Sequence, residues 1–295
     1  MISGDVHGVI VPVITPVDGE DRVDEGAYRN QLRHLMKAGV HGIFAGGSAG
    51  EGPLLVHKEW ERMAEIAFQE CNGKVHLLGG AMETSTRRIL ERVRILARMG
   101  YKRFVVSPTY YVGSKLPEEH LRLFGECKEH SEGMELIVYN IPSCTGSRIT
   151  VETICEMARR GWIRYCKESS EDLDYFQELV TKGGSFGLRV LMGSERKASE
   201  GLQLGAWGLV PVCANYEPAT FIAAYEGRND KQKLMAAQER INALVQNLAL
   251  GPRMWLAGVK YAVAKTQGGS GKPVSPLEPV SEDEKKRIDS FLCAH

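Results

Sequence analysis

A lysine stands where an apolar stretch of the sequence ends. The stretch "WIRYCKESSEDLDYF" covers residues 162–176, and its apolar start predicts a short buried strand that is followed directly by Lys167. Burial disfavours the charged ammonium group and lowers its pKa, and a neutral amine attacks carbonyl groups to form a Schiff base. The alternative is a lysine that pairs with Glu168 or another carboxylate, and position alone favours this second interpretation.

Other predicted strand ends carry polar groups that catalysis uses. Tyr139, in "LIVYNIP", has a phenol that can transfer protons to and from a substrate, although a buried tyrosine more often belongs to the core. The turn "GGSAGEG" offers backbone N–H groups and the Ser48 hydroxyl to a carboxylate or phosphate, or is a tight turn that needs glycine. Tyr110 and Tyr111 allow the same core interpretation or a contact between subunits.

Eight short apolar runs must position these residues. They are rich in Val and Ile and show little polar alternation, as is typical of strands buried on both faces. With amphipathic stretches between them, they predict parallel strands in a (β/α)8 TIM barrel, whose active site lies at the carboxyl ends of the strands. An open doubly wound sheet is the alternative, but no GxGxxG follows the first run. The predicted strands are residues 8–17, 42–47, 75–81, 103–108, 136–142, 163–169, 188–194 and 208–215.

The strand pattern stops after the eighth run. Earlier amphipathic stretches, such as residues 24–39 and 85–100, end in a glycine that is typical of a helix C-terminus. We therefore expect a barrel domain at residues 1–225 and a C-terminal helical extension at residues 226–295. The helices expected in this extension cover residues 230–250, 255–268 and 281–295.

Composition restricts the class of protein. The chain has 295 residues with 37 Lys plus Arg and 37 Asp plus Glu, and this zero net charge argues against a nucleic-acid or membrane-surface role. No apolar run approaches a membrane span, and the N-terminus shows no signal peptide. The seven cysteines form no CxxC pair, so we expect reduced thiols in a cytoplasmic protein. The histidines lack metal-ligand spacing, so we expect no metal.

Four segments together resemble one family. "GGSAGEG", "YNIPSCTG", "CKESS" and "GLVPVCAN" follow the order and spacing of the dihydrodipicolinate synthase / N-acetylneuraminate lyase family. That family comprises Schiff-base-forming aldolases and dehydratases on a (β/α)8 barrel. The resemblance extends from "PVITPVDGEDRVDEGAY" to "PLEPVSEDEKKRI", nearly the whole chain. It implies a lyase that acts on pyruvate or another 2-oxo acid.

The resemblance implies a role for individual residues. Lys167 matches the lysine that attacks the keto group, which reverses the preference for a paired lysine. Tyr139 matches the acid/base phenol beside it. Ser48 matches a hydroxyl that relays protons and contacts the substrate carboxylate, with the Ala49 backbone N–H as a second donor.

Two further matches concern the edge of the site. Tyr110 resembles a tyrosine that in many members reaches into the site of the neighbouring subunit, and Val210 matches a position whose backbone carbonyl faces the substrate. The resemblance also implies a homo-oligomer, expected to be a tetramer built as a dimer of dimers. It implies no metal and no cofactor besides the covalent Schiff base on Lys167.

Departures from the family pattern bear on the substrate. Synthase members that use aspartate semialdehyde have arginine where Cys144 stands, and sialic-acid lyases have two acids where Ser194 and Glu195 stand. The remaining branch acts on hydroxylated 2-oxo (sugar) acids, by retro-aldol cleavage to pyruvate or by dehydration. There, Ser143, Ser194 and Glu195 are expected to bind substrate hydroxyls beside Cys144.

Two other functions stay open at this point. One is 4-hydroxy-tetrahydrodipicolinate synthase activity, the condensation of pyruvate with aspartate semialdehyde, with Arg148 or Arg196 replacing the missing arginine. The other is a catalytically silent barrel that binds a 2-oxo acid as a sensor. The presence of both Lys167 and Tyr139 argues against the silent barrel.

Overall fold

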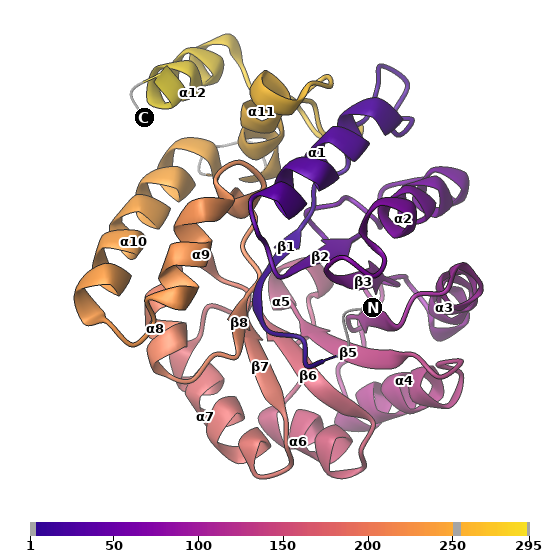
Figure 1. The fold of residues 1–295 in the computed structure, drawn as a ribbon. Helices are drawn as coiled ribbons and strands as arrows, with labels where there is room; N and C mark the ends of the chain where they lie inside the picture. Colours follow the sequence, from indigo (N-terminus) through magenta and orange to yellow (C-terminus); the bar gives the residue numbers. More distant parts are fainter. Residues whose placement is uncertain (1–3, 250–254, 294–295) are drawn as a thin grey trace.

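Eight parallel strands close into a barrel in the order of the chain. The computed structural model describes residues 4–249 and 255–293, and in it β1 pairs with β8 to complete the ring (Figure 1). The predicted (β/α)8 barrel is therefore confirmed. The strands are β1 Gly8–Pro12, β2 Gly42–Ala45, β3 His76–Gly80, β4 Arg103–Val106, β5 Glu135–Asn140, β6 Ile163–Glu168, β7 Arg189–Met192 and β8 Gly208–Leu209.

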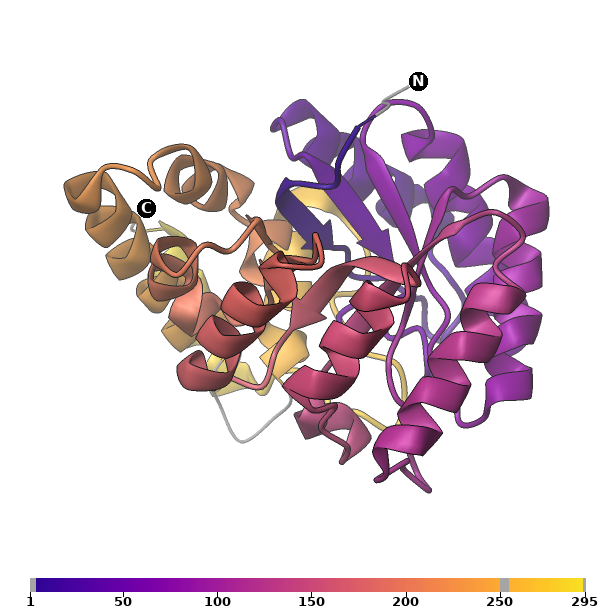
Figure 2. The same ribbon diagram turned by 90° about the horizontal axis from the view of Figure 1, so that it is seen from below.

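Helices lie along the outside of these strands (Figure 2). Two of the glycine signals hold, because Gly39 follows α1 and Gly100 caps α3, both with a positive φ that glycine adopts freely. The barrel helices are α1 Glu25–Lys37, α2 His57–Cys71, α3 Thr86–Met99, α4 Pro117–Glu129, α5 Pro142–Thr145, α6 Val151–Arg159, α7 Leu173–Gly184, α8 Ala198–Gln203 and α9 Pro218–Glu226.

The chain after the barrel is helical, as expected. It forms α10 Lys231–Leu244, a short π-helix η3 Val245–Ala249, α11 Trp255–Gln267 and α12 Glu282–Cys293. Helix α10 packs against α9, and α11 contacts α1 (Figure 1). Parts of two predicted helices, residue 250 and residues 294–295, lie outside the described residues. The boundary between residues 225 and 226 stays a prediction.

Most strands are shorter than the apolar runs that predict them. The eighth run was expected to be a strand at residues 208–215, but it leaves the sheet after Leu209 and ends in a 3-10 turn at Cys213–Asn215. The buried Asn215 side chain explains this correction, since its amide donates to the Pro12 carbonyl (3.0 Å) and accepts from the Ile14 N–H (3.0 Å). A side chain thus satisfies backbone groups that strand pairing would otherwise satisfy.

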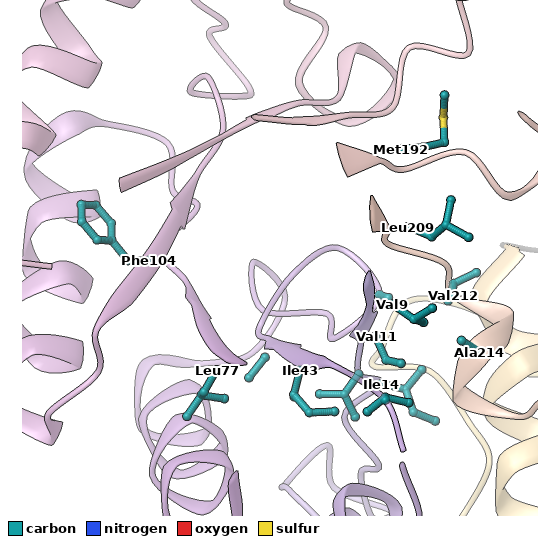
Figure 3. Close-up of a cluster of buried hydrophobic side chains, with 14 of the residues drawn as sticks. Val9, Val11, Ile14, Ile43, Leu77, Phe104, Met192, Leu209, Val212 and Ala214 are labelled. Carbon is teal, nitrogen blue, oxygen red and sulfur yellow. The ribbon is translucent and has the colours of Figure 1, made fainter. Parts of the chain in front are cut away.

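Alternation along the strands separates two buried layers. Val9 and Val11, two residues apart on β1, belong to the layer between the strands and the helices, part of which Figure 3 shows. The second layer fills the barrel and includes Ile137, Tyr139 and Tyr165. Inward-facing residues on β5 and β6 therefore occur at odd numbers, and Lys167 continues this series.

Three histidines meet at the amino-terminal end of the barrel. The ring of His7 contacts the rings of His41 and His76 edge to face, at centroid distances of 5.4 and 5.5 Å. His76 is 3% exposed and its Nδ1 has no hydrogen-bond partner. Burial, with Arg103 and the other two histidines, lowers the pKa of His76 to about 4.

We predict that His76 makes the fold less stable in mild acid. The unfolded chain takes up a proton near pH 6.5 and the folded chain near pH 4, so stability falls as the pH drops between these values, by up to roughly 3 kcal/mol. His76→Phe should flatten this dependence in urea unfolding, whereas His57→Gln, at an exposed position, should not. Equal pH dependence in all three proteins would refute the assignment.

Candidate active site

Strand pairing brings Lys167 and Tyr139 together at the carboxyl end of the barrel. The two residues are register partners on β6 and β5, and the Lys167 Nζ lies 4.0 Å from the centroid of the Tyr139 ring. The same Nζ is 5.3 Å from the ring of Phe44 on β2. The amine therefore lies between two aromatic faces, in the position where active sites of such barrels are found.

The next register pair holds these strands from the other side. Asn140 and Glu168 face the helices, and the Asn140 amide donates to the Glu168 carboxylate at 3.1 Å. Glu168 also accepts from the Ser170 N–H at 2.7 Å, and Asn140 accepts from the Ile149 N–H at 3.1 Å. This buried network fixes the alignment that places Tyr139 beside Lys167.

Lys167 is a buried amine without a carboxylate partner in the described chain. It is 6% exposed, Glu168 points to the opposite face of β6, and none of the ion pairs within residues 4–249 and 255–293 includes Lys167. The interpretation as a paired lysine is therefore wrong. Burial lowers the pKa of Lys167 to about 7, although Cys144 and Glu195 act in the opposite direction.

The phenol beside the amine stays protonated. Burial raises the pKa of Tyr139 well above its usual value, and Cys144 adds to this effect, while the nearby Ser169 and Ser48 hydroxyls lower it. A neutral phenol next to an amine that is partly neutral near pH 7 can donate a proton in one step and recover it in the next.

Gly193 makes room for this arrangement. A Cβ atom at Gly193 would lie 1.9 Å from the Ser169 Oγ and 3.1 Å from the Lys167 Cε. Any larger residue at this position would therefore displace the Ser169 side chain and crowd the lysine side chain.

The glycine-rich turn after β2 places Ser48 and Ala49 against the same space. It is tightly folded, because a Cβ at Gly52 would meet the Gly46 carbonyl at 2.1 Å, and the buried Thr15 hydroxyl donates to the Gly50 carbonyl at 2.7 Å. A fixed turn with a hydroxyl and an N–H group is suited to binding a carboxylate.

These groups line one cavity of about 250 Å³ at the carboxyl ends of the strands. Of the residues expected from the sequence, Lys167, Tyr139, Ser48, Ala49, Cys144, Ser194, Glu195 and Val210 all line it, as does Ser143. Arg196, which the sequence suggested as a replacement for the missing arginine, lines it too. Residues that the sequence did not single out complete the wall: Pro12, Ile141, Ser169, Glu171, Gly193, Val212, Val245, Ala249 and Trp255. Ser169 follows Lys167 by two positions, so strand alternation would have found it.

Glu195 is already engaged by the protein. It is buried, and its carboxylate accepts from the Cys213 N–H at 2.5 Å, which anchors the segment after β8. Burial raises the pKa of Glu195, and the Cys213 backbone lowers it. Its expected contact with substrate hydroxyls stays a prediction.

Tyr110 is not among the residues that line the cavity. It is half-buried and packs against the layer inside the barrel. The neighbouring Tyr111 is 96% exposed and has a φ of 73°, an uncommon backbone conformation for a residue other than glycine. The tandem tyrosines are thus divided between the interior and the surface, which the letters of the sequence do not reveal.

Arginines were expected near the cavity as replacements for the missing cation, and they differ in their surroundings. Arg148 pairs with Asp172 at 2.7 Å and stacks on the Tyr175 ring at 4.3 Å, so its charge is used elsewhere. Arg196 lines the cavity, and no ion pair of its guanidinium is found in residues 4–249 and 255–293.

Comparison with known proteins gives consistent matches over the whole chain. The profile of the dihydrodipicolinate synthetase family matches residues 5–295. A DapA-like lyase of Halobacterium salinarum is 30% identical over 99% of this chain and 95% of its own length. A 4-hydroxy-tetrahydrodipicolinate synthase of Methanopyrus kandleri is 32% identical over 96% of this chain and 94% of its own length.

Solved structures agree with the fold. A crystal structure of dihydrodipicolinate synthase superposes with a TM-score of 0.90 at 25% identity, covering 98% of this chain and 99% of the other. The dihydrodipicolinate synthase of Bacteroides thetaiotaomicron superposes with a TM-score of 0.92 at 24% identity, covering 98% of both chains.

The pH dependence of covalent trapping should report the Lys167 pKa. We expect the rate of cyanoborohydride trapping with pyruvate to rise with pH and to level off above about pH 7, because only the neutral amine attacks a carbonyl. Lys167→Ala should not be trapped. A pH midpoint near 10, or trapping that persists in Lys167→Ala, would contradict the role of this amine.

Tyr139→Phe keeps the ring but loses the phenol proton, so turnover should fall by roughly 10²–10⁴-fold.

Proposed function

Because this chain belongs to the dihydrodipicolinate synthetase family, we propose that it is a Schiff-base-forming lyase that acts on a 2-oxo acid. The observation that carries the proposal is the buried Lys167 amine, which has a lowered pKa and no carboxylate partner in the described chain. The proposed reaction is retro-aldol cleavage to pyruvate or dehydration of a hydroxylated 2-oxo acid.

The proposed mechanism assigns each step to a named group. The neutral Lys167 amine attacks C2 of the 2-oxo acid, and Tyr139 gives the proton with which the carbinolamine oxygen leaves as water. The resulting iminium is an electron sink, so C3 can lose a proton or a carbon substituent. Ser48 Oγ and the Ala49 N–H hold the carboxylate throughout, and Ser48 relays protons to Tyr139. The scheme needs no metal and no dissociable cofactor.

Neutral groups support a hydroxylated chain as the second half of the substrate. Cys144, Ser143 and Ser194 line the cavity, and none of these side chains carries a fixed positive charge. A thiol is a weak hydrogen-bond donor and binds a second carboxylate poorly, whereas the two serines can bind hydroxyls.

A specific observation favours the second candidate, 4-hydroxy-tetrahydrodipicolinate synthase activity. Arg196 brings an available positive charge to the cavity wall. The carboxylate of aspartate semialdehyde, the second substrate of this synthase, would need such a charge. Relatives that carry this synthase name at 32–33% identity point in the same direction. The choice between the two candidates depends on which groups Arg196 and Cys144 meet in the bound substrate.

A substrate screen separates the candidates. We expect pyruvate release or loss of water from at least one hydroxylated 2-oxo acid, and a low kcat/KM for condensation of pyruvate with aspartate semialdehyde. Cys144→Arg should raise the kcat/KM of this condensation about ten- to a hundredfold, the usual contribution of one charge-assisted hydrogen bond. Efficient condensation by the wild type, lost in Arg196→Gln, would establish the second candidate. Pyruvate trapping without turnover of any substrate would indicate a silent 2-oxo-acid sensor.

We further propose a homo-oligomer, with a tetramer as the expected form. Tyr111, Val112 and Leu116 are 96%, 80% and 56% exposed on the segment after β4, an apolar surface that a second copy would cover. The expected reach of Tyr110 into the site of a partner stays a prediction, and the exposed Tyr111 lies beside it on the same segment. The seven free cysteines support the cytoplasm as the location, and no binding of nucleic acid or membranes is expected. No helix among the described residues is long and apolar enough to span a bilayer.

Tyr111→Ala should weaken this assembly. Light scattering of the wild type is expected to give several times the 32.6 kDa mass of one chain. The variant should already be dissociated at protein concentrations at which the wild type stays assembled. Met235→Ala is a matched control, because Met235 is 55% exposed but lies on α10. A monomeric wild type would contradict the proposal.

A further inference from the structure

Glu51 is the charged residue of the glycine-rich turn, and the mechanism above does not use it. It is 1% exposed and has a φ of 54°, which is uncommon for a residue other than glycine. Its carboxylate forms an ion pair with the Lys260 Nζ and accepts a hydrogen bond from the Val274 N–H at 2.7 Å. Both partners come from the C-terminal extension, so the extension holds the turn from behind.

Lys260 is as deeply buried as its partner. It is 1% exposed and lies on α11, 209 residues after Glu51 in the sequence. Trp255, on the same helix, lines the cavity. One helix therefore forms part of the cavity wall with one residue and holds the glycine-rich turn with another.

The turn is rigid enough to transmit the position of Glu51. The Glu51 N–H donates to the Ser48 carbonyl at 3.1 Å, and the Gly52 N–H donates to the Gly47 carbonyl at 3.2 Å. Loss of either charged partner would leave the other charge buried and unpaired, which strongly favours movement of the chain toward solvent. Such movement of Glu51 would displace Ser48 and Ala49 with it.

We propose that Lys260 and Glu51 are positioning residues that hold Ser48 Oγ and the Ala49 N–H where the carboxylate of the substrate binds. This inference rests on the proposed function, since it assigns the carboxylate to that turn. Lys167 and Tyr139 lie on β6 and β5, and a separate hydrogen-bond network fixes the alignment of these strands. Loss of the ion pair between Glu51 and Lys260 should therefore weaken carboxylate binding and leave the chemistry of the amine intact.

Lys260→Met tests the proposal through trapping with two ketones. For pyruvate, the concentration that gives half the maximal cyanoborohydride trapping rate should rise about tenfold, with the maximal rate within about threefold of the wild type. Acetone has the ketone but no carboxylate, so its slow trapping should be unchanged. A merely structural role would lower the melting temperature without changing the ratio between the two ketones.

Two further variants complete the design. Lys265→Met is the control, because Lys265 is on the same helix but forms an exposed pair with Asp289, and it should trap both ketones normally. Glu51→Gln/Lys260→Met removes both charges and keeps an acceptor for the Val274 N–H, so pyruvate affinity should return toward the wild-type value. This double variant also carries the test if Lys260→Met does not fold.

The outcomes separate this inference from the proposed function. An unchanged half-saturating concentration of pyruvate in folded Lys260→Met, or an equal loss of pyruvate and acetone trapping, would overturn the positioning role alone. A wild type that traps neither ketone would overturn the proposed function and the positioning role with it.

Discussion

The register between β5 and β6 is the constraint on which the site depends. Side chains alternate between the two faces of a strand, so a shift by one residue would turn Tyr139 toward the helices and bring Asn140 into the barrel. The buried bond between Asn140 and Glu168 opposes such a shift, because sliding would leave both polar groups unsatisfied. A pair of residues on the outer face thus determines which atoms meet on the inner face.

The same geometry explains why the amine can remain neutral. The interior of the barrel is filled by apolar and aromatic side chains, and Lys167 meets the rings of Tyr139 and Phe44 where a carboxylate would be expected. Aromatic faces attract a cation only modestly, so they offset a small part of the cost of desolvation. The carboxylates nearby are directed elsewhere: Glu168 bonds to Asn140, and Glu195 bonds to the Cys213 backbone.

The sequence predicted the features that depend on local pattern. The eight strands, the helical extension, and the positions of Lys167 and Tyr139 at strand ends all follow from apolar runs and alternation along the chain. Contacts between distant segments could not be predicted in this way. The Trp255 wall and the pairing of Glu51 with Lys260 arise only when residues far apart in sequence pack together. The eighth strand was predicted, but its early end after Leu209 was not, because a single buried side chain, Asn215, replaces the strand pairing that the apolar run suggested.

The cavity wall divides into residues that hold the barrel together and residues that do not. Strand residues and the glycine-rich turn are tied into hydrogen-bond networks, whereas Ser143, Cys144 and Arg196 are exposed on short helical turns after β5 and β7. Substitutions at these three positions lie outside the paired strands. Under the proposed function, changes at these positions alter the contacts made by the second half of the substrate and leave Lys167 and Tyr139 in place, so substrate preference and fold stability can change independently of each other.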